Sequence, residues 1–123
     1  MTNPQHTSLN PRPRTIVITG ASDGIGAAAA RTLSRRRPAD KLVLVGRNPE
    51  KTKRVADEVG AAYHVADFES LGQVRDLADE LNALPEINAL GNNAGGIFDG
   101  PFMTADGFER TWQVKVVAPF LLT

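Results

Sequence analysis

Three glycines near the amino end of the chain have a spacing typical of a loop that binds a phosphate group. Gly20, Gly24 and Gly26 form the pattern G-x-x-x-G-x-G between a short β-branched run and an alanine-rich segment. At a strand-to-helix turn, backbone N–H groups and the positive end of the helix dipole converge on an anion, and glycine lets a pyrophosphate approach the backbone. No Gly-Lys-Ser/Thr follows, which excludes a P-loop. The alternative is a plain strand-to-helix turn that binds no ligand.

Other chemistry is restricted by the composition. The chain has no cysteine, which excludes disulfides, thiolate metal sites and a cysteine nucleophile. His6 and His64 lack suitably spaced partners, so we expect no metal site. Fourteen basic side chains balance fourteen acidic ones, which argues against a nucleic-acid partner. No run is apolar enough for a secretory leader or a membrane span. We therefore expect a cytoplasmic protein without a membrane partner.

The segments that would position the glycine turn alternate between strand and helix. Short apolar runs predict strands at 15–19, 41–45, 61–65 and 87–90. Caps and apolar spacing predict helices at 24–37, 49–59, 71–81 and 107–123. In the first of these, Ile25, Ala29 and Leu33 repeat on one face, and the last is apolar nearly all round, which predicts a buried helix. Ser70 and Gln73 form a capping-box signature at the start of the helix predicted at 71–81.

This alternation predicts an α/β fold, a Rossmann-type doubly wound parallel sheet with helices on both faces. The sheet would be incomplete, with about four strand–helix units. Residues 1–13, which carry three prolines among polar groups, are expected to form a flexible N-terminal tail. Residues 14–123 are expected to form one domain.

Two motifs together resemble the short-chain dehydrogenase/reductase family. Thr-Gly-x-x-x-Gly-Ile-Gly follows the first predicted strand, and Asn-Asn-Ala-Gly at 92–95 follows the fourth. The resemblance covers 14–123 and implies an NAD(P)-binding Rossmann domain. It implies that Asn93, Ala94 and Gly95 lie beside the cofactor, and that Asn92 or Asn93 ties neighbouring strands together. It further implies that the pyrophosphate and ribose contact the first motif, at Gly20, Ser22, Asp23, Gly24, Ile25 and Gly26. Nucleotide-sugar epimerases are disfavoured, because their glycines usually follow G-x-x-G-x-x-G.

The end of the second predicted strand favours NADP(H) over NAD(H). NAD sites place a carboxylate there for the ribose 2′-hydroxyl, whereas this chain has Arg47 and Asn48, with no acid before Glu50. A guanidinium that binds a 2′-phosphate would give about a tenfold to hundredfold preference. Alternatively, Arg47 is a solvated surface charge. The resemblance implies that Asp67 meets the adenine amino group and Phe68 flanks the ring, although Asp67 could also be a plain loop acid.

The residues that would move a proton with the hydride are not found in the chain. The family uses a tyrosine with a lysine four residues on, assisted by a serine, because a phenol needs a nearby cation to act near neutral pH. Tyr63 is the only tyrosine, and Asp67 stands four residues after it. We therefore assign no catalytic residue and predict that a domain ending before this segment is inactive alone. Lys115 stands where the family's asparagine is expected, and Gly91 is unusual at a strand end.

The sequence thus predicts the NADP(H)-binding portion of a short-chain oxidoreductase that transfers hydride between the nicotinamide and an alcohol or carbonyl substrate. The alternative is a non-catalytic nucleotide-binding module or an inactive truncated relative, which Lys115 and Gly91 favour. The resemblance implies that the last helix packs against a partner subunit in a homo-oligomer. A weaker resemblance, to retinol-dehydrogenase-like members, rests on Phe108, Glu109, Trp112, Gln113 and the run 119–123.

Overall fold

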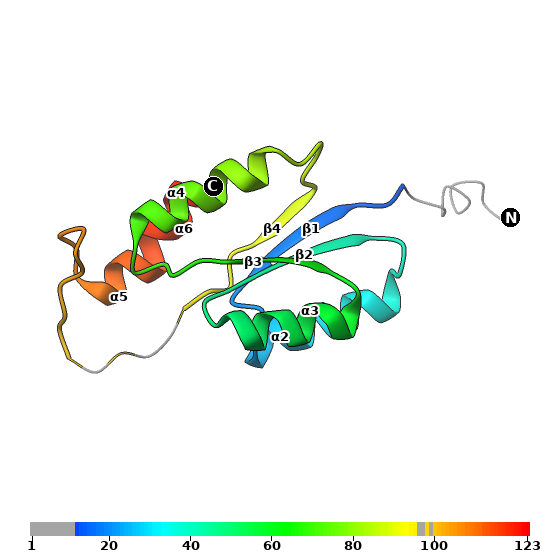
Figure 1. Cartoon of the computed structure of the whole chain (residues 1–123), viewed down its shortest axis with the longest axis horizontal. Helices are drawn as coiled ribbons and strands as arrows, with labels where there is room; N and C mark the ends of the chain where they lie inside the picture. Colours follow the sequence, from blue (N-terminus) through cyan, green and yellow to red (C-terminus); the bar gives the residue numbers. More distant parts are fainter. Residues whose placement is uncertain (1–11, 96–97, 99) are drawn as a thin grey trace, which may run out of the picture.

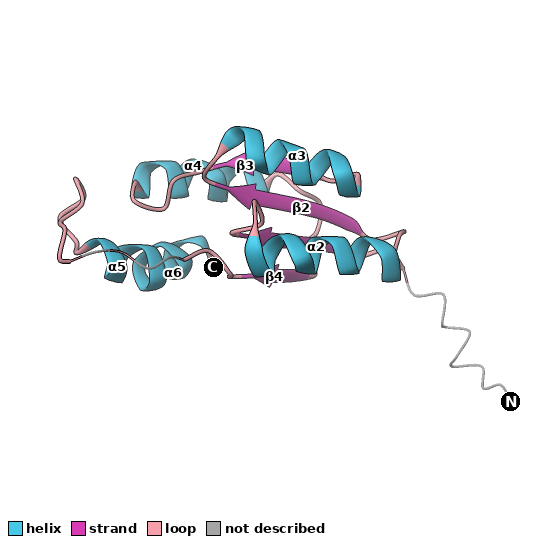
Figure 2. Ribbon diagram, turned by 90° about the horizontal axis from the view of Figure 1, so that it is seen from below, coloured by secondary structure: helices cyan, strands magenta, loops and turns pink. Residues whose placement is uncertain are grey.

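A parallel four-stranded sheet lies between two layers of helices (Figures 1 and 2). The computed structural model describes residues 12–95, 98 and 100–123, so most of the predicted tail, including His6, lies outside the described residues. The strands are β1 (Thr15–Thr19), β2 (Lys41–Gly46), β3 (Ala62–Val65) and β4 (Ala89–Gly91). The helices are α2 (Gly24–Arg36), α3 (Pro49–Val59), α4 (Leu71–Asn82), α5 (Arg110–Trp112), the π-helical turn η1 (Gln113–Val117) and α6 (Ala118–Leu122). The predicted Rossmann-type fold class is confirmed.

The strand order places a reversal of chain direction next to the glycine turn. The order is β3-β2-β1-β4, with every neighbouring pair parallel. The chain therefore moves outward from β1 to β3 and then returns to the other side of β1. Ligands of open parallel sheets bind at such a point, beyond the carboxyl ends of the strands. In this chain that point lies between β1 and β4.

Each face of the sheet has its own core, and alternate strand residues serve the two cores. Ile16 and Ile18 point to the face covered by α2 and α3, whereas Val17 points to the face covered by α4, η1 and α6 (Figure 1). The central strands are buried almost completely, which explains why their sequences are apolar without alternation. No helix in the described residues combines the length and apolarity needed to cross a bilayer.

Helix α2 packs through a face that differs in part from the one predicted, since Leu33 packs against the core but Ile25 does not. Ile25 is 80% exposed, and the buried residues are Gly26, Ala27 and Ala30. The start of α2 lies against the glycine turn and the loop after β4, where a Cβ on Gly26 would meet Gly20 and Asn93, so there is no room for a large side chain at this end of the helix. The prediction was therefore wrong for Ile25, at the start of the helix.

The predicted buried helix over 107–123 was also wrong in two respects. Gly107 has a φ of 87° and lies in a turn closed by Thr104, so the helix begins only at Arg110, where the Glu109 side chain accepts hydrogen bonds from two backbone N–H groups. Some of its apolar residues are buried and others are exposed, because the helix packs against the described residues through one face. Val114, Ala118 and Leu122 are buried, whereas Trp112, Val116 and Phe120 are exposed.

The caps of the other two helices largely follow the sequence. The Asn48 side chain accepts a hydrogen bond from Lys51 N (2.9 Å), Pro49 occupies the first turn, and α3 ends at Gly60 with a φ of 71°. Ser70 Oγ accepts from Gln73 N (3.3 Å), as predicted. The reciprocal half of the capping box is absent among the described hydrogen bonds, because the Gln73 side chain instead accepts from Asp67 N (2.9 Å).

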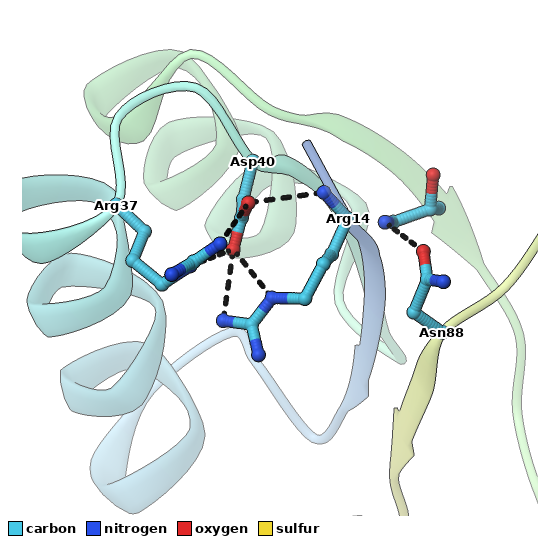
Figure 3. A network of polar contacts seen from close by, with 5 residues as sticks. Arg14, Arg37, Asp40 and Asn88 are labelled. Atoms are coloured by element: carbon cyan, nitrogen blue, oxygen red, sulfur yellow. Dashed lines mark hydrogen bonds and ion pairs between the residues drawn. The ribbon is translucent and has the colours of Figure 1, made fainter. Parts of the chain in front are cut away.

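A buried carboxylate links the segments that precede β1 and β2 (Figure 3). Asp40, whose side chain is 1% exposed, accepts hydrogen bonds from the backbone N–H and the guanidinium of Arg14 (3.0 and 3.1 Å) and from Nε of Arg37 (2.7 Å). Nearby, Thr15 N donates to the side chain of Asn88 (2.7 Å), just before β4. The hydrogen bond from Arg37, aided by those from Arg14, holds the pKa of Asp40 well below its usual range.

We predict that Asp40→Asn lowers the free energy of unfolding by about 1.5–3 kcal/mol at neutral pH, the value of hydrogen bonds to a charged group. The folded pKa is depressed, so this stabilisation is complete above the unfolded pKa and is lost as pH falls through the folded one. The difference between wild type and variant should therefore be constant from about pH 5 to 7 and shrink below about pH 4. Urea unfolding across this range measures it.

Asp57→Asn is the matched control, because Asp57 pairs with Lys53 on the exposed surface of α3. A surface pair contributes little, so this variant should unfold nearly as the wild type does. Equal losses in the two variants would contradict the role assigned to Asp40.

Candidate functional site

The glycine turn is shaped by contacts that exclude side chains. Gly20 and Gly24 have φ values of 66° and 56°, a region that other residues rarely adopt. A Cβ atom on Gly20 would lie 2.8 Å from Cα of Ala94, and one on Gly26 would lie 2.2 Å from the carbonyl oxygen of Gly20. The first glycine thus permits a close approach to the loop after β4, and the third lets α2 pack onto the turn itself.

The amino end of α2 differs from those of the other long helices. Asp23 occupies the N-cap position in an extended conformation, but its side chain makes no capping hydrogen bond. In contrast, Asn48 caps α3 and Ser70 caps α4. The first N–H groups of α2, two of them in residues that line the cavity at the end of the sheet (Gly24 and Ile25), therefore have no acceptor among the described residues. Together with the helix dipole, they form a site suited to an anion such as a phosphate.

The Asn-Asn-Ala-Gly segment is tied to β1 by one buried hydroxyl. Thr19 Oγ1 accepts hydrogen bonds from the N–H groups of Asn93 and Ala94, each at 3.0 Å, and donates to the carbonyl of Gly91 (3.3 Å). The Asn93 side chain also donates to the carbonyl of Gly20 (3.3 Å). Of the two asparagines considered from the sequence, Asn93 links the strands, whereas the side chain of Asn92 donates to Thr123 Oγ1 (3.4 Å).

These segments surround an open cavity of about 720 Å³ at the carboxyl ends of the strands. It is large enough for a small-molecule ligand. Twelve of the thirteen residues predicted to bind the cofactor line it, in three groups: the glycine turn, the end of β2 with the loop after β3, and the loop after β4. They are Gly20, Ser22, Asp23, Gly24, Ile25, Arg47, Asn48, Asp67, Phe68, Asn93, Ala94 and Gly95. Gly26 lies behind the wall, in contact with Gly20 and Asn93.

Charged residues gather where β2 and β3 end. Arg47 NH1 lies 3.3 Å from an oxygen of Glu69, and Lys51 Nζ lies 3.7 Å from an oxygen of Asp23. Lys51 and Glu69 line the cavity and were not predicted from the sequence. Lys51 stands one helical turn beyond Asn48, and that spacing could have indicated it. The position of Glu69 depends on the pairing of β2 with β3, which the sequence does not state.

The two residues predicted to hold the adenine ring lie in different environments. Asp67 lines the cavity, and its Oδ1 accepts a hydrogen bond from Glu69 N (2.9 Å), so it also has the loop role considered as an alternative. Phe68 is 6% exposed and packs in the core beneath α4. It offers only a small part of its ring to the cavity, because it fills the space between the sheet and the helices on that face.

Lys115 is exposed on the π-helical turn. Its Cε lies 3.9 Å from the point that a Cβ on Gly95 would occupy, so its aliphatic stem passes the cavity loop on the way to solvent. A lysine among valines can keep its charged end in water in this way. Tyr63 lies on the edge strand β3 and is 37% exposed, outside the cavity lining.

Comparison with known proteins supplies the family. Residues 14–123 match the family described as short chain dehydrogenase. The chain belongs to this family. It is 46% identical over 116 residues to a Streptomyces protein named "Putative daunorubicin C-13 ketoreductase DnrU", covering 89% of this chain and 40% of that protein. It is 33% identical over 118 residues to human retinol dehydrogenase 13, covering 89% and 35%. The retinol-dehydrogenase-like resemblance is thereby confirmed, and the chain spans about two fifths of the length of these relatives.

Solved structures of the family agree with the fold. A short-chain dehydrogenase from Sphingobium yanoikuyae in complex with NADPH superimposes with a TM-score of 0.69 at 35% identity, covering 89% of this chain and 45% of that one. A bulky-bulky ketone specific alcohol dehydrogenase from Comamonas testosteroni gives 0.77 at 28% identity, covering 90% and 47%. The fold of this chain therefore agrees with that of both solved structures.

The glycine contacts give a test of the turn. An added methyl group on Gly26 has no room, because it would meet the backbone oxygen of Gly20. We predict that Gly26→Ala lowers the free energy of unfolding by about 1–3 kcal/mol, as other overpacked sites do. The matched variant is Gly72→Ala in α4, where the added Cβ has its first neighbour at 3.8 Å. This variant should raise the free energy of unfolding by about 0.5–1 kcal/mol. Chemical denaturation of both variants measures this, and a stable Gly26→Ala would contradict the packing described.

Proposed function

We propose that this chain is the NADP(H)-binding portion of a short-chain oxidoreductase that acts on an alcohol or carbonyl substrate. The observation that carries the proposal is the arrangement of the uncapped amino end of α2, the glycine turn and Arg47 around one cavity. The NADPH complex of the Sphingobium relative supports a nicotinamide cofactor here. In this proposal the bound nicotinamide donates or accepts the hydride.

The residues of the cavity fit such a cofactor. The N–H groups of the first turn of α2 would bind the pyrophosphate, because they have no internal acceptor among the described residues and carry the positive end of the dipole. Arg47 and Asn48, at the end of β2, would hold the 2′-phosphate. Asp67 would meet the adenine amino group, and Asn93, Ala94 and Gly95 would lie beside the cofactor at the reversal point of the sheet.

The second candidate is a module that binds the nucleotide without catalysis, which Lys115 at the expected asparagine position favours. Tyr63, the only tyrosine of the 123 residues, does not line the cavity, so no tyrosine of this chain is placed to exchange a proton with a substrate there. We propose that the isolated chain binds cofactor and does not reduce ketones. NADPH consumption beyond the rate without protein, measured with a panel of ketones, would contradict this.

A subunit partner is a further part of the proposal. Trp112, Val116 and Phe120 are exposed on the segment from α5 to α6, and Phe120 is 84% exposed. Large aromatic side chains in this state are typical of a protein interface. They support the expectation that this segment packs against a partner subunit in a homo-oligomer.

Cofactor choice tests the proposal. We predict that the chain binds NADPH and that Arg47→Gln weakens this binding about tenfold to hundredfold, the value of a hydrogen bond between charged groups. NADH has no 2′-phosphate, so its affinity should change much less. Isothermal titration calorimetry with both nucleotides provides the measurement.

Arg54→Gln serves as the control, because Arg54 is an exposed cation of α3 outside the cavity lining. It should leave both affinities nearly unchanged. If a folded chain bound neither nucleotide, the proposed function would be wrong. If Arg47→Gln weakened NADPH and NADH equally, Arg47 would not contact a 2′-phosphate.

A further inference from the structure

Both cations in the wall of the cavity already have an acidic partner. Five charged side chains contribute to the wall: Asp23, Arg47, Lys51, Asp67 and Glu69. Arg47 lies 3.3 Å from Glu69, and Lys51 lies 3.7 Å from Asp23. The wall therefore carries one more acid than base. A 2′-phosphate entering this cavity has to compete with carboxylates of the chain for its cations.

The two members of the Arg47–Glu69 pair differ in how firmly they are held. The backbone N–H of Glu69 donates to the side chain of Asp67 (2.9 Å), and the next N–H, of Ser70, donates to the carbonyl of Asp67 (2.9 Å). The Glu69 side chain is 22% exposed, whereas that of Arg47 is 66% exposed. In the described part of the chain neither side chain makes a hydrogen bond other than the one that joins them, so the difference lies in burial and in the bonded backbone at Glu69. Arg47 is thus the member that can turn to a ligand, and Glu69 remains in place.

We propose that Glu69 is a specificity-determining residue, which competes with the 2′-phosphate of the cofactor for Arg47; this inference rests on the proposed function. When the ribose carries a hydroxyl group, Arg47 stays paired with Glu69, and neither of these two charges is left without a partner. When it carries a phosphate, Arg47 exchanges the carboxylate for the phosphate, and Glu69 remains beside a second negative group. Glu69 therefore reduces the preference of the site for NADP(H) over NAD(H), so that the site also accepts NAD(H).

The test is the ratio of the dissociation constants of the intact chain for NADH and NADPH, measured by calorimetry. Glu69→Gln keeps the shape of the side chain and removes its charge. We expect it to tighten NADPH binding about fivefold, the scale of an exposed ion pair, with little change for NADH. Glu50→Gln is the matched control, since Glu50 lies three residues from Arg47 in the first turn of α3 and outside the cavity wall.

The same substitution made in the Arg47→Gln variant distinguishes competition for Arg47 from simple repulsion between Glu69 and the 2′-phosphate. In the Arg47→Gln variant, Glu69 has no guanidinium to pair with. The Glu69→Gln substitution should therefore have little effect on NADPH affinity when it is added to this variant. An equal effect in both backgrounds, or an equal effect of Glu50→Gln, would overturn the proposal, because either indicates general repulsion. An unchanged ratio in Glu69→Gln would also overturn it, while leaving the proposed function intact. Failure of folded wild type to bind either nucleotide would overturn both.

Discussion

The buried hydroxyl of Thr19 is the interaction on which the arrangement of the site depends. It makes three hydrogen bonds, two from the N–H groups of Asn93 and Ala94 and one to the carbonyl of Gly91. One donor and two acceptor positions are all that a hydroxyl offers, so this group is fully satisfied without solvent. It thereby fixes the end of β1 against the loop that leaves β4, at a point where the sheet reverses its order.

This fixed point also explains why glycine is required on both sides of it. The chain turns from β1 into α2 directly beneath Ala94, at a distance that leaves no space for a side chain on Gly20. The helix then begins against the turn itself, which excludes a side chain on Gly26. A larger residue at either position would separate α2 from the loop after β4. The amino end of α2 would then no longer point into the cavity.

The local signals in the sequence were sufficient for the elements and for most of the wall of the cavity. Strand runs, caps and glycine spacing are short-range properties, and the structure agrees with them at Asn48, Gly60 and Ser70. The errors arose where packing decides. Ile25 was expected to be buried because it repeats with Ala29 and Leu33 on one face, but the start of α2 lies too close to the glycine turn for a large side chain, and Gly26 and Ala27 are buried there. The last helix was expected to be buried because it is apolar nearly all round, although only one of its faces packs against the described part of the chain.

The charge balance of the cavity shows a second limit of local reasoning. Arg47 was interpreted alone, as a cation at the end of β2, because its neighbours in sequence are uncharged. The register of the sheet pairs Gly46 with Val65, which brings the segments that follow β2 and β3 side by side. Arg47 and Glu69 are 22 residues apart in the chain, yet they meet across this edge. The strand order that forms the cavity also brings the carboxylate of Glu69 to Arg47. A cofactor preference inferred from Arg47 alone therefore depends on the strand order.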